Sequence, residues 1–171
     1  INRPKQEKKE VEAYNLEEMQ RILKLADEDE NPDIKLILNL ALLSGIRRGE
    51  MAGLKWKNVN FDESYIYICE SRVVVEGGKE YTKNPKTQAG IRKIYIPERL
   101  VNVLEEYHKR YLENKLKYGK QFKDKGYVLS KPNGEPKMWV LKNALESGLI
   151  KILDDNLQAC PKCGRKILAE G

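Results

Sequence analysis

Residues 44–56 read Ser-Gly-Ile-Arg-Arg-Gly-Glu-Met-Ala-Gly-Leu-Lys-Trp, and they follow a largely apolar run at 36–43. This run predicts a buried helix, and Gly45 is well placed to end it as a residue in the left-handed conformation. Two arginines, Arg47 and Arg48, come next, where a new helix should begin. These residues alone leave two interpretations open. Either a planar guanidinium is aimed at a phosphate beside glycines that allow close approach, or this is a helix–helix corner with solvated arginines.

The same segment, continued through residues 59–61 (Val-Asn-Phe), resembles the first arginine box of the tyrosine recombinases, the phage integrase family. The resemblance implies that Arg47 contacts the scissile phosphate of a DNA substrate. It also implies that the acid three residues later, Glu50, supports the site from one helical turn away. We assign the neighbouring Arg48 to DNA binding.

A second basic cluster lies at 79–93, where five basic residues and one acid fall on a predicted hairpin too short to have its own core. A protruding basic hairpin suits phosphate contact, although a charge run is also typical of a solvated loop. The tyrosine recombinases carry a lysine on a hairpin, and Lys-Thr at 86–87 followed by Arg-Lys-Ile-Tyr-Ile-Pro at 92–97 resembles that setting. The resemblance implies Lys86 as a general acid, with Lys83 as the weaker candidate. Three hairpin residues are assigned to DNA binding: Lys83, Thr87 and Arg92.

The resemblance implies a metal-free transesterification in which a tyrosine hydroxyl attacks a DNA phosphodiester and leaves a 3′-phosphotyrosyl link. A lysine ammonium would give a proton to the leaving deoxyribose oxygen. Two arginines would hold the non-bridging oxygens, on which negative charge develops in the transition state. Arg47 would be one of them. Because the covalent link conserves the phosphodiester energy, no nucleotide cofactor is expected, and the resemblance implies that the reaction needs no metal.

The second half of the family pattern, a His-x-x-Arg box followed by the nucleophilic tyrosine, is not matched. The single histidine, His108, lies too early, and the last of nine tyrosines is Tyr127. Where the box belongs, the apolar register places Asp155 and Gln158, and neither side chain can hold a phosphate. We expect the resemblance to stop near residue 152 and the chain alone to be catalytically inactive. The alternative is a non-catalytic DNA-binding remnant or regulator.

Charge and composition agree with a partner such as double-stranded DNA without requiring it. The 171 residues include 32 Lys+Arg and 26 Asp+Glu, and the pI is near 9.1. No apolar run approaches the roughly 18 residues of a membrane span. An odd count of three cysteines and the lack of a signal-peptide pattern indicate the cytoplasm. The resemblance implies self-association on DNA for the intact family.

The chain divides into three parts by composition: a basic linker or arm at 1–12, a partial catalytic domain at 13–152, and a divergent tail at 153–171. The arm could equally be plain disorder, and the opening residue Ile1 suggests an excised or processed fragment. The tail carries Cys160 and Cys163 in a Cys-Pro-Lys-Cys sequence that resembles one knuckle of a zinc ribbon. A structural zinc site needs four ligands, so no metal site is predicted there.

The period of the apolar residues predicts an α+β fold, mainly helical with a small three-stranded antiparallel sheet. Asn15 and Glu18 form a capping-box signature for the first helix, and Pro97 is well placed to begin a later one. Trp56 is expected as a core anchor and His108 as a surface or flank residue. Four β-rich stretches predict the sheet: 65–69, 72–76, 79–83 and 92–96.

Overall fold

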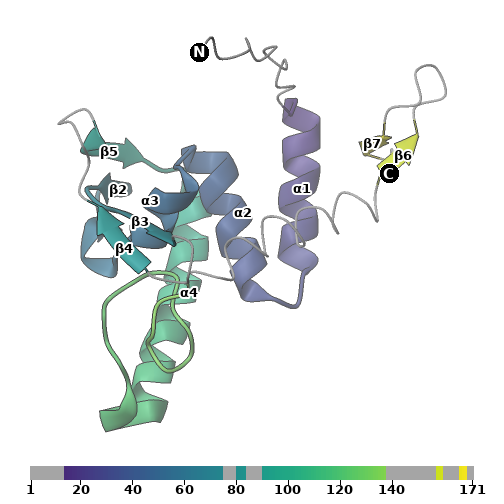
Figure 1. The fold of residues 1–171 in the computed structure, drawn as a ribbon. Coiled ribbons are helices and arrows are strands. Elements are labelled where there is room, and N and C mark those ends of the chain that lie inside the picture. The colour runs from purple at the N-terminus through teal and green to yellow at the C-terminus, as the bar shows by residue number, and fades with distance from the viewer. Residues whose placement is uncertain (1–13, 75–79, 84–89, 138–156, 160–165, 169–171) are drawn as a thin grey trace, which may run out of the picture.

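The structure, a computed structural model, describes residues 14–74, 80–83, 90–137, 157–159 and 166–168. It has the predicted α+β architecture (Figure 1). Helix α2 (Pro32–Ser44) lies between helices α1 (Leu16–Glu28) and α4 (Glu98–Tyr118), and the small sheet lies on the side of α2 away from α1.

Helices α1 and α2 begin and end where the local sequence places their caps. The Asn15 side chain accepts a hydrogen bond from the Glu18 amide, and the Glu18 carboxylate accepts one from the Asn15 amide, which confirms the predicted capping box. Helix α2 has Pro32 in its first turn and ends at Gly45, which adopts the left-handed conformation with φ 61°. Local signals were sufficient for both helices.

The predicted sheet has three strands, but two of the predicted strands are not part of it. Strands β1 (Val59–Asn60), β2 (Tyr65–Ile68) and β5 (Arg92–Tyr95) form an antiparallel sheet in the order β1-β2-β5. Strands β3 (Ser71–Val74) and β4 (Glu80–Lys83) pair only with each other in a separate two-stranded ribbon. With only two residues, β1 is too short to show a period in the sequence.

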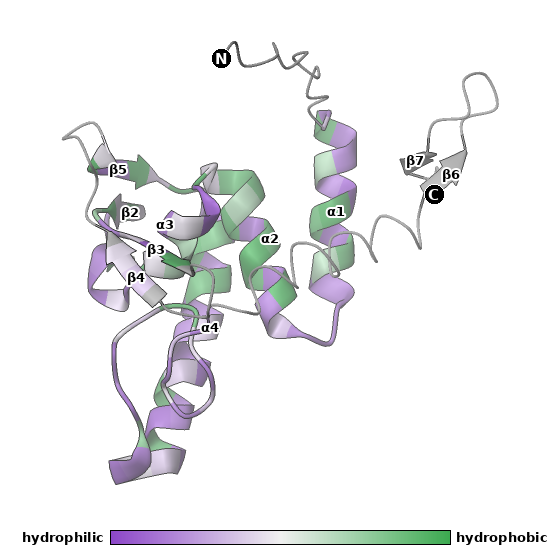
Figure 2. Cartoon of the chain, viewed as in Figure 1, coloured by the Kyte–Doolittle hydropathy of each residue, from purple (hydrophilic) through white to green (hydrophobic). Residues whose placement is uncertain are grey.

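The hydrophobic core lies between α2, the sheet and the first half of α4. Leu36 and Leu40 of α2, Ile66 of β2, and Leu100 and Leu104 of α4 are all completely buried. Apolar colour runs along α2 and the adjoining part of α4, whereas the C-terminal half of α4 is largely hydrophilic (Figure 2). The sheet therefore rests on a continuous apolar surface.

The segment that follows α4 and the turn η3 (Gly119–Gln121) folds back across the molecule. The Val128 amide donates to the Leu54 carbonyl at 2.9 Å, and Val128 itself is completely buried. Two further short strands, β6 (Leu157–Ala159) and β7 (Lys166–Leu168), pair antiparallel. The arm at 1–12 and the two tail cysteines lie outside the described residues.

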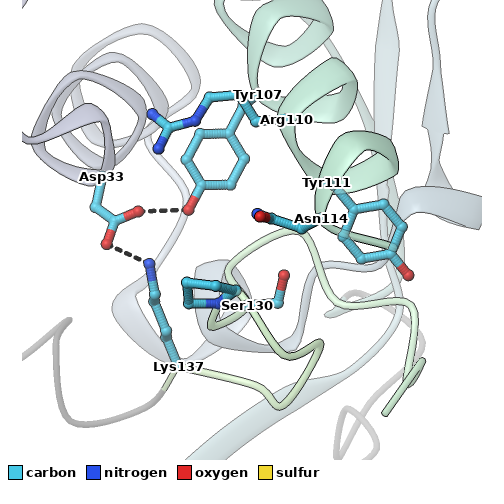
Figure 3. A pocket seen from close by; sticks show the side chains of 8 residues that line it. Asp33, Tyr107, Arg110, Tyr111, Asn114, Ser130 and Lys137 are labelled. Atoms are coloured by element: carbon cyan, nitrogen blue, oxygen red, sulfur yellow. Dashed lines mark hydrogen bonds and ion pairs between the residues drawn. The ribbon is translucent and has the colours of Figure 1, made fainter. Parts of the chain in front are cut away.

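A buried carboxylate at the start of α2 ties this returning segment in place. Tyr107 of α4 donates its hydroxyl to Asp33 Oδ1, and Lys137 Nζ donates to Asp33 Oδ2 at 2.5 Å (Figure 3). Burial, followed by the charge of Asp33, raises the pKa of Tyr107, so its hydroxyl stays protonated and can donate. Arg110 and Ser130 help to line the small polar cavity, of about 40 Å³, beside these groups.

His108 is half-buried in an aromatic cluster rather than at the surface. Its ring centroid lies 4.4 Å from that of Trp56, 5.8 Å from Phe61 and 6.1 Å from Tyr111. Burial lowers the pKa of His108. Trp56 packs against the core, as predicted. In the described part of the chain, no helix is both long and apolar enough to cross a bilayer.

Candidate functional site

The arginine of the first box lies at the junction of α2 and the short helix α3 (Arg48–Gly53). Arg47 is the N-cap residue of α3, so its backbone is fixed at the corner that begins with Gly45. Its amide donates to Glu50 Oε2 at 3.0 Å, and its Nη1 donates to Glu50 Oε1 at 3.1 Å. Its side chain is nevertheless 79% exposed. The guanidinium is anchored at its base and open to an incoming anion.

Glu50 is buried and serves as the hub of the site. It accepts a bidentate pair from Arg92 on β5, with Nη1 to Oε1 at 3.0 Å and Nη2 to Oε2 at 2.9 Å. These hydrogen bonds, assisted by those from Arg47 and opposed by burial, lower the pKa of Glu50 to about 2. The carboxylate is therefore ionised throughout the neutral range, and the hydrogen bonds that it accepts from Arg92 in turn raise the pKa of Arg92.

Glu50 contacts Arg47, the residue that it was predicted to support. Arg92, the other partner of Glu50, was predicted only as a DNA contact. The two residues are 42 positions apart in the chain. No local pattern signals the pair, because a salt bridge between a helix and a distant strand requires the tertiary fold. The structure brings Arg47, Glu50 and Arg92 together.

The glycines of the arginine box allow close packing of protein on protein. A Cβ at Gly49 would lie 2.5 Å from Ser71 Oγ, and a Cβ at Gly53 would lie 2.8 Å from the carbonyl oxygen of Glu70. Real Cβ atoms do not approach other atoms so closely. The neighbour of Gly53 is backbone, so this position requires glycine for α3 to pack against β3, whereas at Gly49 the rotatable Ser71 hydroxyl would have to move. This is a different reason from the phosphate approach inferred from the sequence.

A cluster of charged and aromatic side chains packs beside the C-terminal end of α3. Lys55 Nζ pairs with Glu70 Oε1 at 2.8 Å and lies 4.8 Å from the ring centroid of Tyr127. Arg72 is buried, with its guanidinium carbon 4.4 Å from the same centroid. Such contacts between a cation and an aromatic face are favourable, and they hold the returning segment against α3 and β3.

The basic segment at 79–93 is not a hairpin of the two strands that flank it. Strand β4 pairs with β3, and β5 pairs with β2, so the connection between them joins two different sheets. The backbone of Lys83 lies in β4, opposite Ser71. Lys86 and Thr87 lie outside the described residues, as does the side chain of Lys83. Arg48 is described and exposed, next to Arg47.

Comparison with known proteins shows the family to which the chain belongs. A family model described as the phage integrase family matches residues 14–139. The chain belongs to this family. The matched range contains Arg47, Glu50, Lys86 and Arg92, and it ends before the divergent tail.

Two curated members illustrate the relationship. A tyrosine recombinase XerC-like protein of Caldanaerobacter subterraneus is 31% identical over 132 residues, which is 71% of this chain and 33% of that protein. The integrase of Staphylococcus phage L54a is 29% identical over 143 residues, which is 76% of this chain and 40% of that protein. The chain therefore spans well under half the length of these members of the integrase family.

Solved structures of family members share the fold. The Tn1549 transposon integrase, in complex with a circular intermediate DNA, matches with a TM-score of 0.66 at 20% identity. The match covers 91% of this chain and 50% of the integrase chain. The XerA recombinase matches with a TM-score of 0.57 at 18% identity, over 92% of this chain and 46% of its own. The mixed helical and antiparallel architecture is thus that of tyrosine recombinase catalytic domains.

Proposed function

We propose that this chain is part of the catalytic domain of a site-specific DNA recombinase, which acts in the cytoplasm on double-stranded DNA. The proposal rests on how Arg47 is held and how far it is exposed. Its backbone is held by a buried carboxylate at a helix corner, while its guanidinium is 79% exposed. An arginine fixed at its base and open at its tip is suited to hold a phosphate bidentately.

In the proposed reaction, Arg47 holds the non-bridging oxygens of the scissile phosphate, where negative charge grows as the tyrosine hydroxyl attacks. A positive group already in place is worth most at that stage because it needs no reorganisation. Lys86 gives a proton to the leaving 5′ oxygen of the deoxyribose. Arg48, Lys83 and Thr87 contribute contacts to the DNA backbone.

We also propose that residues 1–171 bind DNA but do not form the covalent link on their own. No tyrosine follows Tyr127, and no His-x-x-Arg box is present. The site contains one arginine of the pair that would hold the phosphate, together with the proposed general acid. Without a tyrosine in the position of the nucleophile, the phosphate is held but not attacked.

A salt titration with a fluorescently labelled DNA duplex tests the binding part of the proposal. Each phosphate contact releases counterions, so the logarithm of the affinity should fall linearly with the logarithm of the salt concentration. Replacing Arg47 with glutamine should reduce this slope by about one. Affinity that is flat with salt, or a slope unchanged in Arg47→Gln, contradicts the proposed phosphate contact.

A suicide substrate, a duplex nicked so that cleavage traps the covalent adduct, tests the inactivity. No protein–DNA adduct should appear on a denaturing gel after incubation with the chain. A recombinase with an intact tyrosine serves as the positive control. A trapped adduct would show that residues 1–171 contain a working nucleophile and would overturn the proposed inactivity.

The second candidate function is a non-catalytic DNA-binding remnant or regulator. Exposed lysines occur in the C-terminal half of α4 and in the segment after it: Lys109, Lys117, Lys120 and Lys125. The C-terminal end of α4 lies away from α3 (Figure 1). If this surface rather than Arg47 holds the DNA, replacing these lysines will lower the salt slope while Arg47→Gln leaves it unchanged.

A further inference from the structure

We infer that Arg92 is a positioning residue, which acts on DNA through Glu50 and Arg47 and does not contact a phosphate itself. The inference rests on the proposed function, since it assigns a task to a neighbour of the proposed phosphate ligand. It differs from the role expected from the sequence, where Arg92 was grouped with the residues that bind DNA.

The first argument is the way in which the two arginines share one carboxylate. Glu50 Oε1 accepts from Arg92 Nη1 at 3.0 Å and from Arg47 Nη1 at 3.1 Å. Glu50 Oε2 accepts from Arg92 Nη2 at 2.9 Å and from the Arg47 backbone amide at 3.0 Å. Arg92 thus takes the bidentate fork geometry, which leaves Arg47 with a single side-chain contact to Glu50.

The second argument is exposure. The Arg92 side chain is 31% exposed and has both terminal nitrogens on Glu50, whereas the Arg47 side chain is 79% exposed. Arg92 also starts a strand that is paired along its length with β2, which fixes its backbone. Of the two guanidinium groups, Arg47 is the one presented to solvent and Arg92 is the one turned towards the protein.

The third argument is the charge of the cluster. One carboxylate and one guanidinium would sum to zero, and Arg47 alone beside Glu50 would be drawn into a closed bidentate ion pair. With Arg92 present, two guanidinium groups and one carboxylate give the cluster a net charge of about +1. Arg92 therefore takes up most of the hydrogen-bonding capacity of the Glu50 carboxylate. The Arg47 guanidinium then remains available to bind a phosphate, and the net positive charge of the cluster favours that binding.

A double-mutant cycle on DNA binding tests the inference with the full chain and a labelled DNA duplex. The variants are Arg47→Gln, Arg92→Gln and the double substitution. If Arg92 acts through Arg47, Arg92→Gln will weaken binding about tenfold in the wild-type background. In the Arg47→Gln background, the same change will weaken it less than about twofold, because the group through which it acts is already gone.

Lys93→Gln is the matched control, since Lys93 is the next residue of β5 and its side chain lies over the ring of Tyr65, on the other side of the strand. It removes the same charge without touching Glu50, so its effect should be equal in both backgrounds. Thermal unfolding of every variant establishes that it is folded at the assay temperature. If Arg92→Gln does not fold, Arg92→Lys replaces it in the cycle, because lysine keeps the charge but cannot form the bidentate pair.

The outcomes separate the inference from the proposed function. Equal losses from Arg92→Gln in both backgrounds would mean that Arg92 makes its own DNA contact, which overturns the inference and leaves the proposed function intact. A salt slope unchanged in Arg47→Gln would overturn the proposed function and the inference with it. A loss that depends on Arg47 supports both.

Discussion

Gly53 in α3 lies so close to Glu70, just before β3, that a Cβ on this glycine would stand 2.8 Å from the Glu70 carbonyl oxygen. The second neighbour of that Cβ would be the Glu70 carbonyl carbon at 3.1 Å. Both are backbone atoms, which cannot rotate away. The contact between the arginine-box helix and the β3–β4 ribbon therefore requires the smallest residue at this position.

Gly53→Ala should lower the free energy of unfolding by about 1–3 kcal/mol, because the new methyl group forces α3 and β3 apart. Urea denaturation measures the change. Gly49→Ala is the matched comparison, since its closest neighbour, at 2.5 Å, is the rotatable Ser71 Oγ. Adding Ser71→Ala should restore much of the stability lost in Gly49→Ala. If Gly53→Ala is as stable as the wild type, the packing of α3 on β3 is looser than described.

The stability of the fold should fall steeply in acid because of Glu50. Its pKa is about 2 in the folded state and 4.5 as a reference. A depressed carboxyl pKa gives stability that is fully present above the unfolded value and is lost as pH falls from 4.5 towards 2. The difference corresponds to about 3 kcal/mol.

Glu50→Gln isolates this contribution. The variant should be less stable than the wild type at neutral pH, since Arg92 and Arg47 lose their anion. Its stability should also decline less between about pH 5 and about pH 2, because the titrating group has been removed. Urea midpoints across this range provide the measurement. Parallel curves for the two proteins would show that other carboxylates account for the acid dependence.

His108 should make the fold less stable in mildly acidic solution. Burial among Trp56, Phe61 and Tyr111 lowers its pKa below the reference value of 6.5, so the folded state holds the neutral ring. The unfolded chain binds the proton first, so stability present above pH 6.5 declines as pH falls below it. Because the chain has a single histidine, one NMR titration of its ring protons gives the folded pKa directly.

His108→Phe keeps an aromatic ring in the cluster and removes the titration. As pH falls from 6.5 towards 4.5, where Glu50 begins to contribute, its unfolding free energy should decline less than that of the wild type. A wild-type titration midpoint at or above 6.5 would contradict the lowered pKa. So would a phenylalanine variant with the same pH dependence as the wild type.

Asp33 should contribute strongly to stability because its carboxylate accepts hydrogen bonds from Tyr107 and Lys137. Asp33→Asn leaves the largely buried ammonium of Lys137, 16% exposed, without its anion, and should cost about 3 kcal/mol or more. Tyr107→Phe removes only a hydroxyl and should cost about 1–2 kcal/mol. Chemical denaturation of both variants and of the double variant measures the coupling. Additive losses would show that Asp33 and Tyr107 do not act as one network.

The local sequence was sufficient to predict the helices whose ends are set by capping residues. The Asn15–Glu18 capping box and the left-handed Gly45 lie within one turn of the helices that they bound, so their spacing alone identified α1 and α2. The first arginine box also identified the family and the pair of Arg47 and Glu50, because three residues of separation place both at the same turn of a helix. The fold class followed from the change of apolar period after Tyr65.

Only the tertiary structure decided which residues that are far apart in the sequence come into contact. The sequence contained the β-rich stretches, but strand pairing is a non-local choice, and packing of α3 against β3 separated the β3–β4 ribbon from the main sheet. Gly53 was interpreted without its neighbour Glu70, and Arg92 without Glu50, because neither contact leaves a periodic trace. A guanidinium and a carboxylate 42 positions apart become partners only when packing of the core fixes both backbones. The sequence by itself determined that Arg47 stands at a helix corner of an integrase-family domain, and the fold decided that Arg92 holds the carboxylate beside it.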